Sequence, residues 1–196
     1  MVDFDVGYGF ATVHQTKSKA GTILLASVAG VFFLTFLIMN NFLPVFLFTA
    51  LFAGINAAMR TYKYLVDETN FAIEIELTMF ATVLMSMAYG VKAGIFTAIV
   101  MALTSDFVTG FNPETPTTVL WYVIAALMAP LFPASFFVGA GIIICIVTTI
   151  ISWGFYHITE SFSPFENFMY QFTDFAFNIY FFFALQWIAR FFLPIA

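Results

Sequence analysis

The stretch FAIEIELTMFATVLMSMAYGVKAGIFTAIVMALTSDFVTG, residues 71–110, decides the fold class. It holds two long apolar runs joined by a tight turn, Gly90 to Gly94, and its acids lie near its outer ends. Neither run alternates apolar and polar residues, so both are expected to be helices rather than strands. About 20 apolar helical residues are enough to cross a bilayer. The stretch therefore predicts a helical hairpin of a membrane protein.

The composition extends this prediction to the whole chain of 196 residues. Hydrophobic residues make up 62% and charged residues 9%, whereas a soluble domain carries about 25% charged residues. Only helices or closed barrels span lipid, because every backbone polar group needs a partner there. We expect an all-α, multi-pass bundle of six to seven transmembrane helices in the cell membrane. The net charge of −5 argues against a nucleic-acid partner.

Seven apolar segments are expected as helices. They lie near 20–39, 42–59, 70–89, 94–109, 118–132, 135–156 and 168–193. Pro130 and Pro133 bend or end the fifth segment, so the fifth and sixth are either separate helices or one broken helix.

If each helix crosses once, all eleven Asp and Glu residues fall on or near one side of the membrane. The loops near 60–70, 111–117 and 157–167 share that side with the N-terminus. The other side holds Lys92 and Arg190 and no acid. The positive-inside rule would place the acid-rich side in the cytoplasm, whereas the segregation of the acids suggests that it is outside.

Polar residues form stripes on three of the expected helices. Asn70, Glu74, Thr78, Thr82 and Ser86 recur every four residues, so they share one face. The 94–109 helix ends with Thr104, Ser105 and Asp106, and the last helix carries Gln171, Asp174 and Asn178 on one face.

These stripes predict a polar pocket that opens to the acid-rich side. Its expected lining is Glu74, Thr78, Asn70, Asp106, Asp174 and Asn178. A carboxylate at membrane depth costs about 2.5–3.5 kcal/mol and is therefore rarely accidental. Glu76 is expected to point elsewhere, and Arg60 and Lys63 are the expected internal partners of Glu74. The alternative is that Asp106 and Asp174 lie in the interfacial layer and that the Thr and Ser hydroxyls bond to their own helices.

Aromatic and small residues add two further expectations. Trp121, Tyr122, Trp153 and Tyr156 lie near helix ends, which is typical of an interfacial belt, and an aromatic wall for a flat ligand is the alternative. Small residues at spacings of four on the 42–59 helix favour close approach of another helix, from a partner subunit or from the same chain. They are Ala50, Ala53, Gly54 and Ala57.

Catalytic motifs, metal-ligand spacings and phosphate-binding glycine loops are absent from the sequence. We therefore expect no enzyme activity, no cofactor and no metal site in this chain.

Residues 42–110 resemble the first half of the S-components of energy-coupling factor transporters, which are small membrane-embedded vitamin-binding subunits. The resemblance rests on FTALFAGINAAMR, residues 48–60, and on the hairpin quoted above. The turn Gly90 to Gly94 lacks the proline that the family often carries there. Residues 1–19 are polar and are expected to form a tail, and 20–196 is expected to be a single transmembrane domain. The resemblance implies that 20–41 is an added helix and 42–196 a six-helix core.

The resemblance also implies that the acid-rich side is extracellular, that residues 60–70 gate the pocket, and that the Ala50–Gly54 and Ala53–Ala57 pairs dock on a membrane coupling subunit. The MreD-like proteins of rod-shape determination have a similar small helical layout and no transport role.

Three functions remain open from the sequence. The first is a substrate-binding subunit for uptake of a small polar or cationic, vitamin-like molecule, which acts with an energising partner. The second is a structural or assembly subunit of a larger membrane complex, without a small-molecule site. The third, a proton or cation pathway through Glu74, ranks last because one side of the membrane carries no acids.

Overall fold

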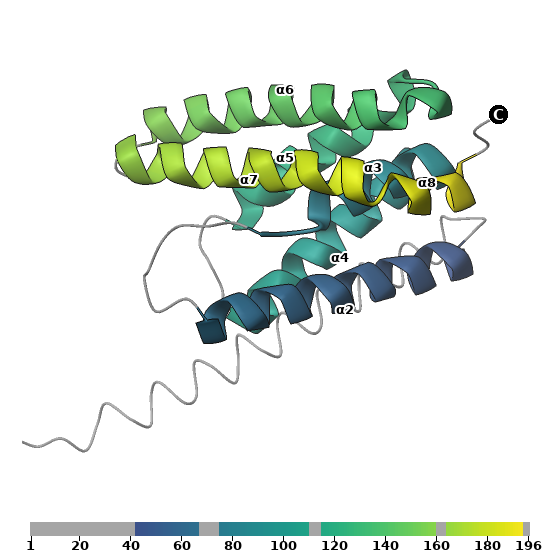
Figure 1. Cartoon of the computed structure of the whole chain (residues 1–196), viewed down its shortest axis with the longest axis horizontal. Coiled ribbons are helices and arrows are strands. Elements are labelled where there is room, and N and C mark those ends of the chain that lie inside the picture. The colour runs from purple at the N-terminus through teal and green to yellow at the C-terminus, as the bar shows by residue number, and fades with distance from the viewer. Residues whose placement is uncertain (1–41, 67–74, 110–114, 160–163, 194–196) are drawn as a thin grey trace, which may run out of the picture. The chain divides into compact units, whose positions relative to one another are not determined.

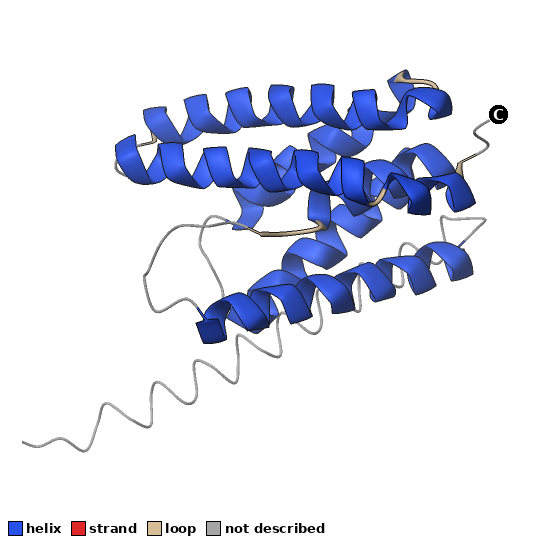
Figure 2. Ribbon diagram, viewed as in Figure 1, coloured by secondary structure: helices blue, strands red, loops and turns tan. Residues whose placement is uncertain are grey.

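The computed structural model describes residues 42–66, 75–109, 115–159 and 164–193, and this part of the chain is helical without a strand (Figures 1 and 2). The tail 1–19 and the expected helix 20–39 lie outside the described residues. The helices are α2 (Phe42–Val66), α3 (Thr78–Tyr89), α4 (Val91–Thr109), α5 (Thr115–Met128), α6 (Phe137–Ile158), α7 (Pro164–Ala184) and α8 (Gln186–Phe192).

Helix α3 is the centre of the described unit. It contacts α2, α4, α5, α6, α7 and α8, and all its residues from Thr78 to Ser86 are buried. Two of its neighbours, α6 and α7, meet it through an aromatic cluster: the Phe80 ring lies 5.7 Å from that of Phe137 and 5.6 Å from that of Phe182, between centroids. The predicted stripe of Thr78, Thr82 and Ser86 is therefore inside the protein, on a helix that is surrounded by others.

The hairpin of α3 and α4 depends on two glycines. Gly90 joins the helices with a φ of 90°, a conformation that side chains with a Cβ rarely adopt. A Cβ at Gly94 would lie 2.5 Å from that of Ser86, so Gly94 permits the close contact of the two helices. The tight turn expected from the sequence is thus confirmed, with α4 beginning at Val91 rather than at 94.

Helix α2 packs on α4 through polar side chains as well as apolar ones. The hydroxyls of Thr49 and Thr97 lie 2.8 Å apart, and Asn56 Nδ2 donates to Ser105 Oγ at 2.9 Å. Such hydrogen bonds fix the register of two largely apolar helices, and each contributes about 0.6 kcal/mol in lipid.

Two helix boundaries differ from the sequence predictions, and long-range contacts lie at both. Helix α2 runs to Val66 instead of ending near 59, and Arg60 within it pairs with Glu76. Helix α3 begins at Thr78 instead of 70, and residues 75–77 are not helical. The backbone N–H of Leu77 donates to Asn56 Oδ1 at 2.6 Å, which ties this segment to α2.

The proline-containing junction separates two helices. The short 3-10 turns Ala129–Leu131 and Ala134–Phe136 lie between α5 and α6, so the fifth and sixth helices are distinct. The expected last helix is also broken: α7 and α8 meet at Leu185 with a bend of 58°.

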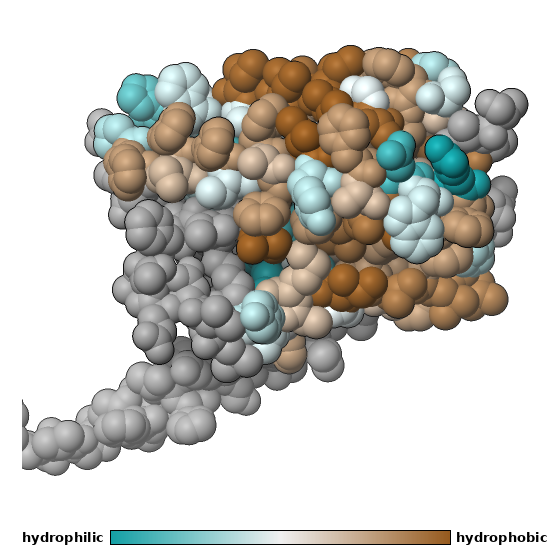
Figure 3. All heavy atoms as spheres, in the orientation of Figure 1, coloured by the Kyte–Doolittle hydropathy of each residue, from teal (hydrophilic) through white to brown (hydrophobic). Residues whose placement is uncertain are grey.

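Two described helices, α2 and α6, are long and apolar enough to cross a membrane, and the bent pair of α7 and α8 makes a third span if it is counted as one. Helices α3 and α5 are shorter. In Figure 3, hydrophobic side chains cover the visible faces of α6 and α2, whereas hydrophilic ones gather over α8, which carries Gln186 and Arg190. The described part of the chain is therefore an all-helical unit with a membrane-compatible surface.

Candidate functional site

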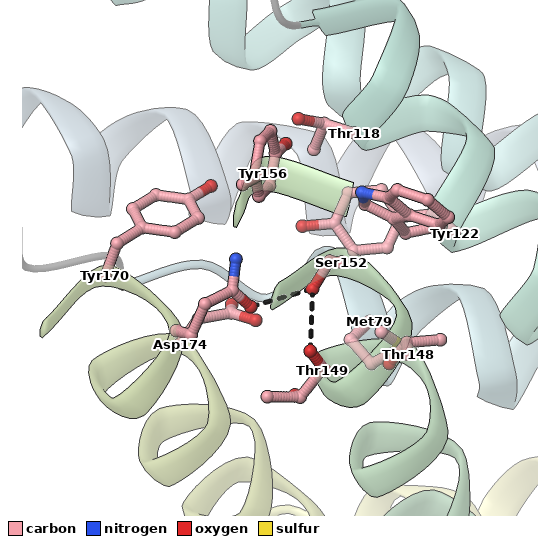
Figure 4. Close-up of a pocket in the computed structure, with 11 residues that line it drawn as sticks. Met79, Thr118, Tyr122, Thr148, Thr149, Ser152, Tyr156, Tyr170 and Asp174 are labelled. Carbon is pink, nitrogen blue, oxygen red and sulfur yellow. Dashed lines mark hydrogen bonds between the residues drawn. The ribbon is translucent and has the colours of Figure 1, made fainter. Parts of the chain in front are cut away.

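A pocket lies where α3, α5, α6 and α7 meet (Figure 4). It encloses about 20 Å³, room for one water molecule, and widens to about 340 Å³ when its open mouth is included. Residues of all four helices line it: Met79, Thr118, Trp121, Tyr122, Thr148, Thr149, Ser152, Tyr156, Tyr170, Gln171 and Asp174. Polar and aromatic side chains therefore dominate a space inside an otherwise apolar bundle.

The inner part of the pocket presents two N–H donors. Ser152 Oγ donates to Gln171 Oε1 at 2.7 Å, so the Gln171 amide is held by its oxygen. Gln171 Nε2 and Trp121 Nε1 are both buried and have no hydrogen-bond partner among the described residues. A buried donor without a partner costs about 1–3 kcal/mol, so both positions favour a further hydrogen-bond acceptor.

Asp174 lies at the mouth of the pocket. It is half-buried, one helical turn beyond Gln171 on α7. Asn178 Nδ2 donates to Asp174 Oδ1 at 2.8 Å, so the two residues predicted together from their spacing are in contact. Among the described residues, the lining contains one carboxylate and neither Lys nor Arg. Asp174 is thus the acid that the described part of the chain brings to the pocket.

Aromatic side chains form the walls. Trp121, Tyr122 and Tyr156 are 9%, 5% and 2% exposed, so the expectation of an interfacial belt is wrong for these three. Only Trp153, at 51%, is exposed as a belt residue would be. The rings of Tyr156 and Tyr170 meet edge to face at a centroid distance of 6.4 Å. The buried three all line the pocket.

The other predicted site residues fall into two groups. Thr78 is buried on α3 and its hydroxyl has no partner among the described residues, but it does not line the pocket. Asn70 and Glu74 lie outside the described residues, as does the side chain of Asp106.

Glu76, which the sequence argument set aside, is one of the most buried charged residues. Its side chain is 3% exposed, and Oε2 lies 2.5 Å from Arg60 Nη2. Glu76 also lies just before the N-terminus of α3, where the helix dipole favours a negative charge. Arg60 therefore pairs with Glu76, a residue for which no partner was predicted.

Spacing could have revealed more of the lining. Thr148, Ser152 and Tyr156 recur every four residues on α6, which is the signature used for the stripe on α3. The stripe on α7 likewise begins one turn earlier than expected, at Asn167, which is 2% exposed. The pattern on α6 is ambiguous in sequence because Tyr also occurs at helix ends for interfacial reasons.

The described residues contain no cluster of His, Cys, Asp and Glu that could hold a metal ion. No protein-family model, curated protein or solved structure matches this chain. The arrangement of the pocket is thus the evidence from which a function can be argued.

Proposed function

We propose that this chain is a multi-pass membrane subunit that captures a small polar or cationic molecule for uptake and acts with an energising partner. The observation that carries the proposal is the pocket between α3, α5, α6 and α7, in which buried N–H donors lie beneath a carboxylate. A concave site with a few convergent polar groups is typical of ligand binding. The chain itself would perform no chemistry.

The position of the pocket supports capture from one side of the membrane. Its lining comes from the first halves of α3, α5 and α7 and from the second half of α6. In alternating membrane helices these ends lie on the same side, the one on which the acids gather. We propose that this side is extracellular. A cysteine at position 114 should then react with a membrane-impermeant reagent in intact cells, and protection would reverse the orientation.

The outer face of α2 supports the partner. Ala50, Gly54 and Ala58 are exposed at spacings of four, and a Cβ added at Gly54 meets no atom within 4 Å. The other predicted pair is not an exposed face, because Ala53 is buried and Ala57 is half-buried. We propose that the Ala50–Gly54–Ala58 face receives a helix of the energising subunit, since small residues let helix backbones approach closely.

Two variants test the proposal. Asp174→Asn keeps the shape of the side chain and removes its charge, so a molecule that co-purifies with the wild-type chain should be lost from the variant in mass spectra of denatured protein. Gly54→Leu should dissociate the partner, and Gly154→Leu on α6, where an added Cβ also meets open space, is the matched control.

The competing function, a structural subunit, makes the opposite prediction. Gly54→Leu would then dissociate the complex, whereas no small molecule would co-purify and Asp174→Asn would change nothing. These results together would contradict uptake and support a role as an assembly subunit.

A further inference from the structure

The start of α3 is not capped by its own side chains. Leu77 is the last residue before α3, and its carbonyl accepts from the N–H of Ala81, the first hydrogen bond of the helix. The residues that normally cap a helix at this position are Ser, Thr, Asp and Asn. Leucine has no acceptor to offer, and no side-chain hydrogen bond caps α3 within the described part of the chain. The local sequence therefore does not fix the beginning of α3 at Thr78.

Helix α2 holds the start of α3 instead. Asn56 Oδ1 accepts the backbone N–H of Leu77 at 2.6 Å, and Arg60, one turn further along α2, pairs with Glu76. Asn56 is 1% exposed, and its Nδ2 donates to Ser105 of α4, so its amide is held at both ends. The four residues Asn56, Arg60, Glu76 and Leu77 thus form a latch between α2 and the start of α3.

The latch lies next to the candidate pocket in the chain. Met79, two residues after Leu77, is buried in the first turn of α3 and lines the pocket (Figure 4). The whole pocket encloses about 20 Å³, room for one water molecule, so a ligand that passes beyond its mouth requires the lining to move. A shift of the first turn of α3 would move Met79 and thereby the wall of the pocket.

Helix α2 is suited to transmit such a shift, because its two faces have different surroundings. The face with Asn56 is buried against α3 and α4, whereas Ala50, Gly54 and Ala58 are exposed on the opposite face. Packed helices move as rigid elements that slide or rotate by small amounts. A displacement imposed on the outer face of α2 therefore reaches the latch.

We propose that α2 regulates the pocket through the latch. With the latch closed, the first turn of α3 keeps Met79 in the wall of the pocket, and displacement of α2 releases that turn and opens the space to a ligand. This proposal rests on the proposed function and names the regulation of the same site, because the energising subunit is proposed to dock on the outer face of α2.

A thiol in the wall of the pocket measures how often the pocket opens. The full chain with Cys145→Ala and Thr148→Cys carries its one thiol in the lining, at a position that is 4% exposed and whose native hydroxyl donates to a carbonyl of its own helix. In lipid nanodiscs, the rate at which a small methanethiosulfonate reagent labels this thiol follows the open fraction when opening is faster than labelling.

Two substitutions on α2 separate the latch from general packing. Asn56→Ala should raise the labelling rate at least about fivefold, since a fivefold change corresponds to about 1 kcal/mol, the worth of one hydrogen bond. Thr49→Val is the matched control and should leave the rate unchanged. Thr49 is also 1% exposed on α2 and its hydroxyl lies 2.8 Å from that of Thr97 on α4, but it is not part of the latch.

A milder pair of variants tests the other half of the latch. Arg60→Lys keeps the charge and loses the geometry of the guanidinium, so it should also raise the labelling rate. Arg190→Lys, on the exposed face of α8, should not. If Asn56→Ala does not yield folded protein, this pair decides.

Equal rates in Asn56→Ala and Thr49→Val would mean that labelling follows a general loosening of the bundle, and an unchanged rate in Asn56→Ala would mean that the pocket is independent of the latch. Either result overturns the proposal. The proposed function is judged separately, by a co-purified molecule that is lost in Asp174→Asn. Such a loss without any response to the latch would retain uptake and refute this regulation, whereas a response to the latch without a co-purified molecule would do the reverse.

Discussion

Glu76 and Asp174 are two acids of one helical unit with opposite surroundings. Glu76 is almost fully buried, and an arginine of the same chain lies 2.5 Å away. Asp174 is half-buried at the mouth of a pocket, and its hydrogen bond from Asn178 comes from a neutral amide. The first acid ties the segment before α3 to α2, whereas the second lies at the edge of a pocket. Acidity and depth alone therefore do not identify a binding residue; the surroundings of the carboxylate do.

The largest effect is expected from Arg60→Met, which leaves Glu76 buried without its cation. Breaking a buried ion pair in this way costs about 3–5 kcal/mol, so the free energy of unfolding in detergent should fall by that amount. Arg190→Met is the matched control, because Arg190 is exposed on α8 and should change stability by less than about 0.5 kcal/mol.

The double variant Arg60→Met with Glu76→Met sharpens this result. Replacing both charges by apolar groups of similar volume is often neutral, so most of the lost stability should return. If the double variant is as unstable as Arg60→Met, the loss came from packing and the electrostatic account of Glu76 is wrong.

A smaller effect is expected from Asn56→Ala. Its amide accepts from the Leu77 N–H and donates to Ser105, so the substitution strands a buried N–H where α3 begins. One such group costs about 1–3 kcal/mol. Thr61→Ala is the control, since its exposed hydroxyl donates to the Ala57 carbonyl of its own helix. If Asn56→Ala and Thr61→Ala have the same melting temperature, Asn56 does not stabilise the start of α3 in the way described.

The smallest effect on stability is expected from Asp174→Asn. Asparagine retains an oxygen that accepts from Asn178, so the free energy of unfolding should change by less than about 0.5 kcal/mol. Glu76→Gln should cost more, about 1–3 kcal/mol, because it leaves the largely buried Arg60 facing a neutral group. Chemical denaturation of the two variants measures both free energies of unfolding. If Asp174→Asn and Glu76→Gln lose the same stability, the distinction between a pocket acid and a structural acid is wrong.

Much of the helical layout is predictable from apolar run lengths and from glycine and proline. The turn Gly90 to Gly94 and the break at Pro130 and Pro133 are confirmed, because these residues act through local backbone geometry. The contact of Asp174 with Asn178 is also local, since residues four apart on a helix are neighbours.

The site was only partly predictable. Spacing placed Asp174 on a polar face with Gln171, and both line the pocket. It did not indicate that α6 completes the site, because Ser152 and Tyr156 are ambiguous between pocket lining and membrane interface until a neighbour is known. Nor did it distinguish Glu76, whose importance depends on Arg60, 16 residues earlier in the chain.

The sequence by itself determined the helical class, the apolar surface and the faces on which polar groups gather, because helical periodicity and bilayer-length runs are properties of short segments. The tertiary structure alone decided that α3 begins at Thr78, that Glu76 is paired, and that Trp121 and Gln171 face one space beneath Asp174. Each of these depends on contacts between helices that are far apart in the chain. A hydrogen bond such as that from Leu77 to Asn56 can override the local preference to extend a helix, and nothing in either segment alone reveals it.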